Sequence, residues 1–237
     1  MIKIRKAAER GQAHHGWLDS YHSFSFAQYH DPEHMGFGAL RVINEDYVQP
    51  GKGFGTHPHQ NMEILTYVLE GAIEHKDSMG NGSVIRPGEV QLMSAGRGVT
   101  HSEFNHSPDE MVHFLQIWVI PNEQGGEPGY QQQPIPSNHS QALTLIASPN
   151  AEQGSLHIKQ DARIYRGILE AGQTLEHRVE AQRQGWLQLA RGELSLSAQG
   201  LDSQTLQAGD GIALQDQGSL TLNAQQPSEF LLFDLPR

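Results

Sequence analysis

The chain has 237 residues, and its 27 acidic and 16 basic side chains give a formal net charge of −11 at pH 7. This length suits one large all-β domain or two domains of about 100–120 residues, and an acidic chain without Lys/Arg-rich windows is not expected to bind nucleic acid. The chain has no cysteine, which excludes disulfides and thiolate metal sites, and no stretch approaches 18 apolar residues. We therefore expect a cytoplasmic protein without a membrane partner.

Alternation of apolar and polar residues predicts β-strands along most of the chain. Residues 21–29 set Phe24 and Phe26 against serines, residues 39–48 alternate in the same way, and residues 113–121 are rich in β-branched and aromatic side chains. Turn sequences rich in Gly and Pro separate these segments at short intervals. An all-β chain with little helix, arranged as a sandwich or barrel, is expected.

The stretch GFGTHPHQNMEILTYVLEG, residues 53–71, contains the first candidate metal ligands. Pro58 biases His57 towards an extended backbone, in which His57 and His59 point to the same face. His101 and Glu103 form a second pair with the same spacing, just after a Gly-rich turn. The alternative is that His101 caps a turn and that Glu103 is a solvated strand residue.

Two such pairs facing each other across a barrel would offer three imidazoles and one carboxylate. This donor set suits a divalent first-row metal, most naturally Fe(II), with Mn, Co, Ni, Cu or Zn as alternatives. An octahedral ion held by four protein groups keeps two open positions, as binding of a substrate and O2 would require.

Three further residues near these pairs have open or structural interpretations. Glu63 lies four residues after His59, so continued alternation would place it in the same cavity as a ligand, an orienting partner of a histidine or a general base. His75, at a predicted strand end, and His106, in a Ser-Pro loop, are interpreted as structural.

Residues 121–141 predict a break between two domains. They contain four prolines, three glycines and several glutamines, with few apolar side chains. We predict an N-terminal metal-binding barrel in residues 1–125, a linker or crossing arm in residues 126–141, and a C-terminal barrel without metal ligands in residues 142–237.

An internal repeat supports two copies of one β-barrel unit. When the second half is shifted back by about 121 residues, apolar runs coincide and three glycine pairs align: Gly51 with Gly172, Gly71 with Gly192, and Gly88 with Gly209. The four candidate ligands do not recur, because their positions are occupied by Arg178, Glu180, Leu222 and Ala224. Histidines that the fold required should be present in both copies, so their loss favours a functional role.

The motifs also resemble a known family. THPHQNMEILTYVLEG and PGEVQLMSAG resemble the two motifs of the cupin superfamily, and together with LRVINEDYV and MSAGRGVTHSE they resemble the pirin family. This resemblance implies a bicupin, with two cupin-type β-barrels (double-stranded β-helix or jelly roll) in one chain and a metal only in the first. It implies His57, His59, His101 and Glu103 as the ligands, and it implies that Glu63 is not one.

Bacterial pirins of this type are similar to quercetin 2,3-dioxygenases. The resemblance therefore implies a metal-dependent dioxygenase that opens the heterocyclic ring of a flavonol such as quercetin with O2 and releases carbon monoxide. Glu103 would be the catalytic base that takes the proton of the flavonol 3-hydroxyl, and the cavity would be lined by Phe24, Phe26, Phe37 and Phe54.

Two other functions are considered. The first is an iron-binding, redox-sensing regulatory protein that modulates a protein partner and uses the same four ligands. The second is a cupin isomerase or epimerase, which fits less well because such enzymes usually work without this four-ligand set.

Overall fold

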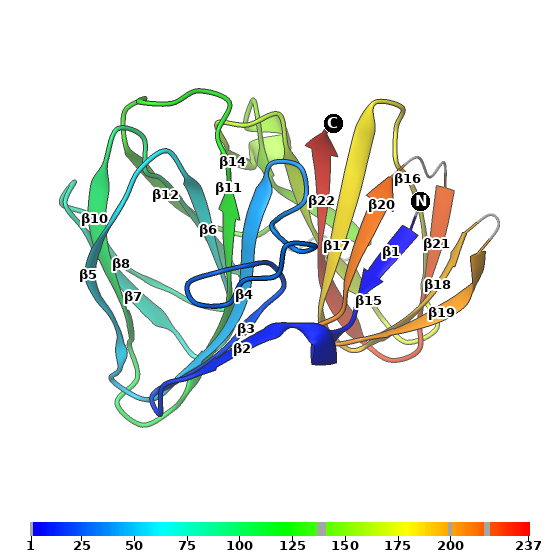
Figure 1. The fold of residues 1–237 in the computed structure, drawn as a ribbon, viewed down its shortest axis with the longest axis horizontal. Helices are drawn as coiled ribbons and strands as arrows, with labels where there is room; N and C mark the ends of the chain where they lie inside the picture. Colours follow the sequence, from blue (N-terminus) through cyan, green and yellow to red (C-terminus); the bar gives the residue numbers. More distant parts are fainter. Residues whose placement is uncertain (1, 137–140, 199–200, 216–218) are drawn as a thin grey trace. The chain divides into compact units, whose positions relative to one another are not determined.

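The computed structural model describes residues 2–136, 141–198, 201–215 and 219–237 and contains β-strands throughout (Figure 1). The helical segments among these residues are two short 3-10 turns, η1 (Ala7–Glu9) and η2 (Glu152–Gly154). The chain forms two compact units: unit 1 comprises Met1–Arg10, Pro136–Ser155 and Asp161–Arg237, and unit 2 comprises Gly11–Ile135 and Leu156–Gln160. The prediction of an all-β chain is confirmed.

Unit 2 consists of two antiparallel sheets. The large sheet has the strand order β12-β9-β6-β11-β4-β3-β2, and the small sheet has the order β5-β10-β7-β8. The strands of these two sheets are β2 (Gly11–His14), β3 (Leu18–His22), β4 (Leu40–Val48), β5 (Gly53–His59), β6 (Glu63–Glu70), β7 (Ile73–Asp77), β8 (Gly82–Ile85), β9 (Glu89–Ser94), β10 (Val99–Asn105), β11 (Val112–Val119) and β12 (Gly129–Pro134). The later segment of the unit contains the two-residue strand β14 (Leu156–His157), which is in neither sheet. An apolar cluster that includes Val68, Ile73, Ile85 and Phe114 joins the two sheets.

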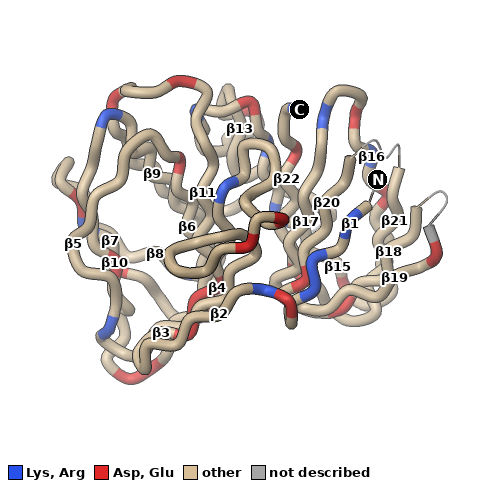
Figure 2. Tube along the Cα trace, in the orientation of Figure 1, with Lys and Arg blue, Asp and Glu red and all other residues tan. Residues whose placement is uncertain are grey.

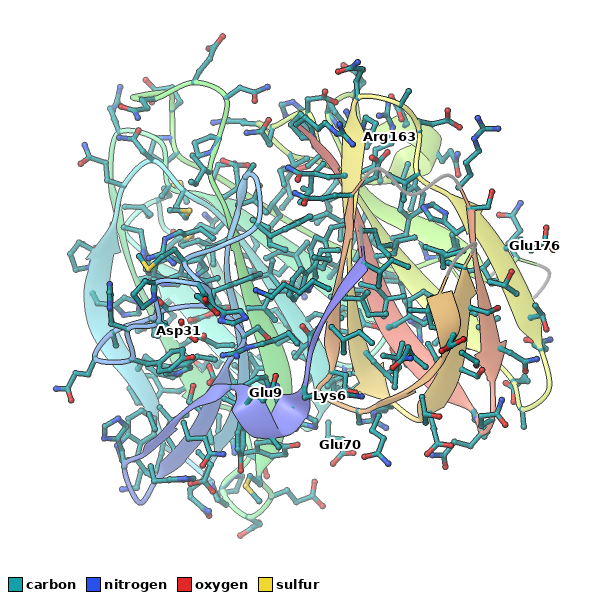
Figure 3. All side chains as sticks on the ribbon, turned by 45° about the vertical axis from the view of Figure 1, so that its right-hand side comes forward. Lys6, Glu9, Asp31, Glu70, Arg163 and Glu176 are labelled. Atoms are coloured by element: carbon teal, nitrogen blue, oxygen red, sulfur yellow. The ribbon has the colours of Figure 1, made fainter. Side chains whose placement is uncertain are left out.

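Unit 1 repeats this arrangement. Its large sheet contains the order β1-β20-β17-β22-β15-β13, and its small sheet has the order β16-β21-β18-β19. Its strands are β1 (Ile2–Arg5), β13 (Leu143–Ser148), β15 (Arg163–Leu169), β16 (Thr174–Arg178), β17 (Arg183–Arg191), β18 (Glu193–Ala198), β19 (Leu201–Gln207), β20 (Gly211–Gln215), β21 (Ser219–Ala224) and β22 (Ser228–Pro236). Lys6, labelled in Figure 3, follows β1 and forms a 3.0 Å ion pair with Asp210.

The strand order confirms the internal repeat. Strands β5-β10-β7-β8 of unit 2 correspond one by one to β16-β21-β18-β19 of unit 1, and β9-β6-β11-β4 correspond to β20-β17-β22-β15. All six aligned glycines have φ between 64° and 88°, a left-handed conformation that side chains disfavour, which explains why glycine recurs at these turns.

The predicted strand over residues 21–29 is wrong for most of its length. Strand β3 ends at His22, and Phe26 and Tyr29 form only an isolated bridge. The alternation was misleading because Ser23 and Ser25 are buried along with Phe24. Polar side chains in this segment therefore do not mark a solvent-exposed face of a strand. Ala27, with φ of 50°, then turns the chain back.

The division of the chain differs in detail from the bounds 1–125, 126–141 and 142–237. Residues 129–134, inside the predicted linker, form β12 and pair with β9 of unit 2. The first ten residues belong to unit 1, where β1 pairs with β20. A Gln-rich edge strand has too little apolar content to be distinguished from a linker by sequence.

Acidic positions outnumber basic ones and the two are interspersed along the trace (Figure 2). Within the described ranges, no helix is long and apolar enough to cross a membrane.

Candidate metal centre and adjoining cavity

Three imidazoles converge between β5 and β10 of unit 2. These strands pair antiparallel, with His57 opposite His101 and His59 opposite Val99. The nearest ring nitrogens of His57, His59 and His101 lie within 4.8 Å of one another, and Nε2 of His57 is 3.1 Å from Nε2 of His101. The two sequence pairs thus lie on neighbouring strands of one sheet, not across the barrel from each other as expected from the sequence, and their side chains meet on one face of that sheet.

A β-bulge shapes this region. The register shifts between His101, opposite His57, and Glu103, opposite Phe54, so β5 contains one extra residue. Gly53 lies against the backbone of Glu103 and Phe104, so closely that a Cβ at this position would overlap both. Glycine at residue 53 thus permits the approach of β5 to the strand that carries His101 and Glu103.

Glu103 is buried, is held by Gln116 and lies next to Thr66, both on the large sheet. Gln116 Nε2 donates a 2.9 Å hydrogen bond to Glu103 Oε2, and Thr66 Oγ1 lies 3.4 Å from Oε1. Thr66 also donates to Gln116 Oε1 at 2.9 Å, which fixes the amide orientation. Glu103 Oε2 lies 4.0 Å from His101 Nε2, so the carboxylate and the imidazoles border the same small volume.

The local electrostatics keep the imidazoles of His59 and His101 neutral. Burial, reinforced by the neighbouring imidazoles, lowers the pKa of His59 to about 4 and that of His101 to about 3. A neutral imidazole has the lone pair that a metal ligand needs, so these two side chains are ready to coordinate at neutral pH without first losing a proton.

His75, which was interpreted from the sequence as a structural residue, lies directly against the ring of His101. It is fully buried, its Nδ1 lies 3.4 Å from Nδ1 of His101, and its Nε2 lies 3.0 Å from Asp77 Oδ2. Asp77 is in turn held by the amide of Asn81 at 3.0 Å. This chain of contacts fixes the His101 ring from the side opposite His57, and the two-residue spacing of His75 and Asp77 was the signal that could have revealed it.

Glu63 does not enter the cavity, so the continued alternation expected for it is wrong. Asn61, with φ of 51°, turns the chain between β5 and β6 and ends the shared register. Glu63 instead accepts hydrogen bonds from Ser94 Oγ at 2.8 Å and from the Lys159 amide at 3.2 Å. Burial raises the pKa of this carboxyl.

A cavity of about 580 Å³ adjoins the imidazoles, a volume typical of small-molecule sites. His57, His59 and Glu103 border it, and its largest apolar walls are Trp17, Leu18, Phe26, Phe54 and Trp118. Of the four phenylalanines expected here, Phe26 and Phe54 line the cavity. Phe24 is buried in the core instead, and Phe37 is not a lining residue.

Comparisons with known proteins agree with this architecture. Residues 3–119 match the family model described as Pirin, and residues 145–235 match the Quercetinase C-terminal cupin domain. The chain is 49% identical over 236 residues to quercetin 2,3-dioxygenase of Escherichia coli (strain K12), covering 100% of this chain and 99% of the relative. It is 38% identical to a pirin-like protein of Caulobacter vibrioides, covering 99% of each chain.

A solved structure is similar over the whole chain. The bacterial pirin YhhW from Escherichia coli, in complex with nickel(II), has a TM-score of 0.92 and 48% sequence identity, and the match covers 100% of this chain and 99% of that one. The two domain matches and this likeness confirm the predicted bicupin fold.

Proposed function

Because the chain belongs to the pirin family, we propose that unit 2 binds one divalent metal ion and uses it in a dioxygenase reaction. The ligands are His57, His59, His101 and Glu103. The substrate is a flavonol such as quercetin, whose heterocyclic ring is opened by O2 with release of carbon monoxide. The observation that carries this proposal is the convergence of three imidazoles and a carboxylate at the wall of an aromatic-lined cavity.

The side chains present fit a metal ion. Two of the imidazoles are neutral at pH 7 because their pKa values are depressed, and the fourth ligand adds a carboxylate charge. Nitrogen and oxygen donors without sulfur suit Fe(II) best, with Mn, Co, Ni, Cu or Zn as alternatives. When bound, such an ion supplies Lewis acidity and the redox chemistry with O2.

The residues of the chain perform the remaining tasks. Glu103 takes the proton of the substrate hydroxyl, since its carboxylate borders both the imidazoles and the cavity. Gln116 holds this carboxylate in one orientation, and Thr66 in turn fixes the Gln116 amide. Phe26, Phe54 and Trp118 orient a planar ring and exclude water from it.

The relatives support this function. A protein 49% identical over the full chain is named quercetin 2,3-dioxygenase, and the related pirin YhhW was solved with nickel(II). The aromatic-lined cavity favours a small-molecule substrate over the alternative in which the same ligands serve a redox-sensing regulatory protein. The reaction would take place in the cytoplasm, as expected from the sequence.

Oxygen uptake with carbon monoxide release on adding quercetin tests the proposal. We expect turnover with the protein loaded with Fe(II), Cu(II) or Ni(II), and a loss of at least 100-fold in Glu103→Gln. Samples that contain one metal ion per chain but show no oxygen uptake and no carbon monoxide would reject the enzymatic function.

A further inference from the structure

A row of polar side chains crosses the inward face of the large sheet of unit 2. Asp46 on β4 lies opposite Ser20 on β3, and Asn44 on β4 lies opposite Gln116 on β11. All four border the cavity. The row begins at Gln116, which is hydrogen-bonded to Glu103. It crosses two strand spacings of about 4.8 Å each and therefore extends about 10 Å from Gln116.

Two buried polar atoms beside the cavity lack a partner. Among the residues that the structure describes, no group forms a hydrogen bond with Asn44 Oδ1 or with Trp118 Nε1. Asn44 is only 3% exposed, and a buried polar atom left without a partner destabilises the protein. An acceptor and a donor are thus available to a molecule in the cavity.

The neighbours of Asn44 are fixed and polar. Ser20 Oγ donates to Asp46 Oδ1 and lies 2.8 Å from His22 Nε2, so the hydroxyl is oriented by two partners. Burial raises the pKa of Asp46 to about 7, so both forms of this carboxyl are populated at neutral pH, and it can donate or accept a hydrogen bond. The polar pair is absent from unit 1, where the positions equivalent to Asn44 and Asp46 are Tyr165 and Gly167. The fold of the repeated unit therefore does not require these two side chains.

We infer that Ser20, Asn44 and Asp46 form a hydroxyl-binding subsite that recognises a polyhydroxylated aromatic ring away from the metal ligands. Aromatic walls from Phe26, Phe54 and Trp118 enclose a planar ring, and Asn44 Oδ1 accepts a hydrogen bond from a ring hydroxyl. This inference rests on the proposed function, since it names which feature of a flavonol the same cavity selects.

The test compares two ligands that differ only in this feature. Quercetin and 3-hydroxyflavone share the ring system, the carbonyl and the 3-hydroxyl, but 3-hydroxyflavone lacks the remaining hydroxyls. Binding is measured by tryptophan fluorescence quenching in the full chain, both metal-free and metal-loaded. We expect the wild type to bind quercetin at least tenfold more tightly.

Asn44→Leu removes the amide at similar volume and should reduce this preference about 5- to 10-fold, the effect of one lost hydrogen bond. Gln91→Leu is the matched control, because Gln91 is also a buried amide with an unpartnered oxygen but does not line the cavity. It should leave the preference unchanged. If Asn44→Leu does not fold, as judged by circular dichroism, the subsite is tested by the preference of the wild type for quercetin and by the loss of that preference in Ser20→Ala.

Equal affinity of the wild type for both ligands, or an unchanged preference in folded Asn44→Leu, would overturn the subsite. Carbon monoxide release is measured separately in the same samples. A preference for quercetin without turnover would support the subsite and reject the dioxygenase. Turnover without such a preference would support the dioxygenase and reject the subsite.

Discussion

At the scale of single residues, Glu103 combines two tasks that are separable by mutation. It borders the imidazoles at 4.0 Å from His101 and also faces the cavity. Glu103→Gln preserves shape but removes the charge and the ability to take up a proton. We expect metal affinity to fall about 10- to 100-fold, while turnover falls further even at saturating metal, as measured by metal titration alongside oxygen uptake.

The depressed pKa values of His59 and His101 predict how the metal-free protein responds to pH. In the unfolded chain these histidines take up protons near pH 6.5, whereas in the folded chain they do so only at about 4 and about 3. Between these pH values the unfolded state binds more protons than the folded state. The contribution of the two neutral imidazoles to the free energy of unfolding is therefore fully present above pH 6.5 and is lost as the pH falls below it. Thermal unfolding with a chelator should show a lower Tm at pH 5 than at pH 7.

His101→Leu is the informative variant for this pH effect, because a leucine, Leu220, occupies the corresponding position of the paired strands in unit 1. It removes one of the two titrating groups, so the difference in Tm between pH 7 and pH 5 should shrink. An equal or larger difference would show that other groups govern the acid sensitivity.

At the scale of elements, β5 and β10 must approach closely for the ligands to meet. Gly53→Ala would force a Cβ into the backbone of Glu103 and Phe104. We expect a loss of about 1–3 kcal/mol in the free energy of unfolding, measured by denaturant titration, together with weaker metal binding. Gly55→Ala, where a Cβ meets open space, should change neither quantity appreciably.

Strand β7 contacts the ligand His101 through His75, which is itself held by Asp77. His75→Leu, which introduces the residue found at the aligned position 196, removes the contact with His101 Nδ1. Metal affinity measured by competition with a chelator should drop about 10- to 100-fold, as is typical when a partner of a ligating histidine is lost. His106→Leu, at a more exposed histidine paired with Glu74, is the control, and an equal drop in it would contradict the role of His75.

At the scale of the whole molecule, one fold is used twice with different interiors. In the paired strands, the inward positions of Thr66, His75 and Glu103 in unit 2 correspond to Leu187, Leu196 and Leu222 in unit 1, and all three leucines are buried in the core. Unit 1 fills its interior with apolar side chains, whereas unit 2 keeps polar groups around a cavity. Metal should accordingly bind in unit 2 alone.

The sequence predicted the part of this organisation that depends on local spacing. The alternating strands, the repeated turn glycines and the two residue pairs His57/His59 and His101/Glu103 could all be recognised in it. It could not show that β7 places His75 behind His101, or that Asn61 turns Glu63 away, because both depend on strand pairing across the sheets. Edge strand β12 was missed because pairing, not apolar content, defines it.

The most direct test of the metal centre is the metal content of purified protein after saturation and dialysis. The wild type should retain about one divalent ion per chain, and His57→Ala and His101→Ala should retain almost none while folding normally by circular dichroism. An undiminished metal content in both variants would contradict the assignment of the centre.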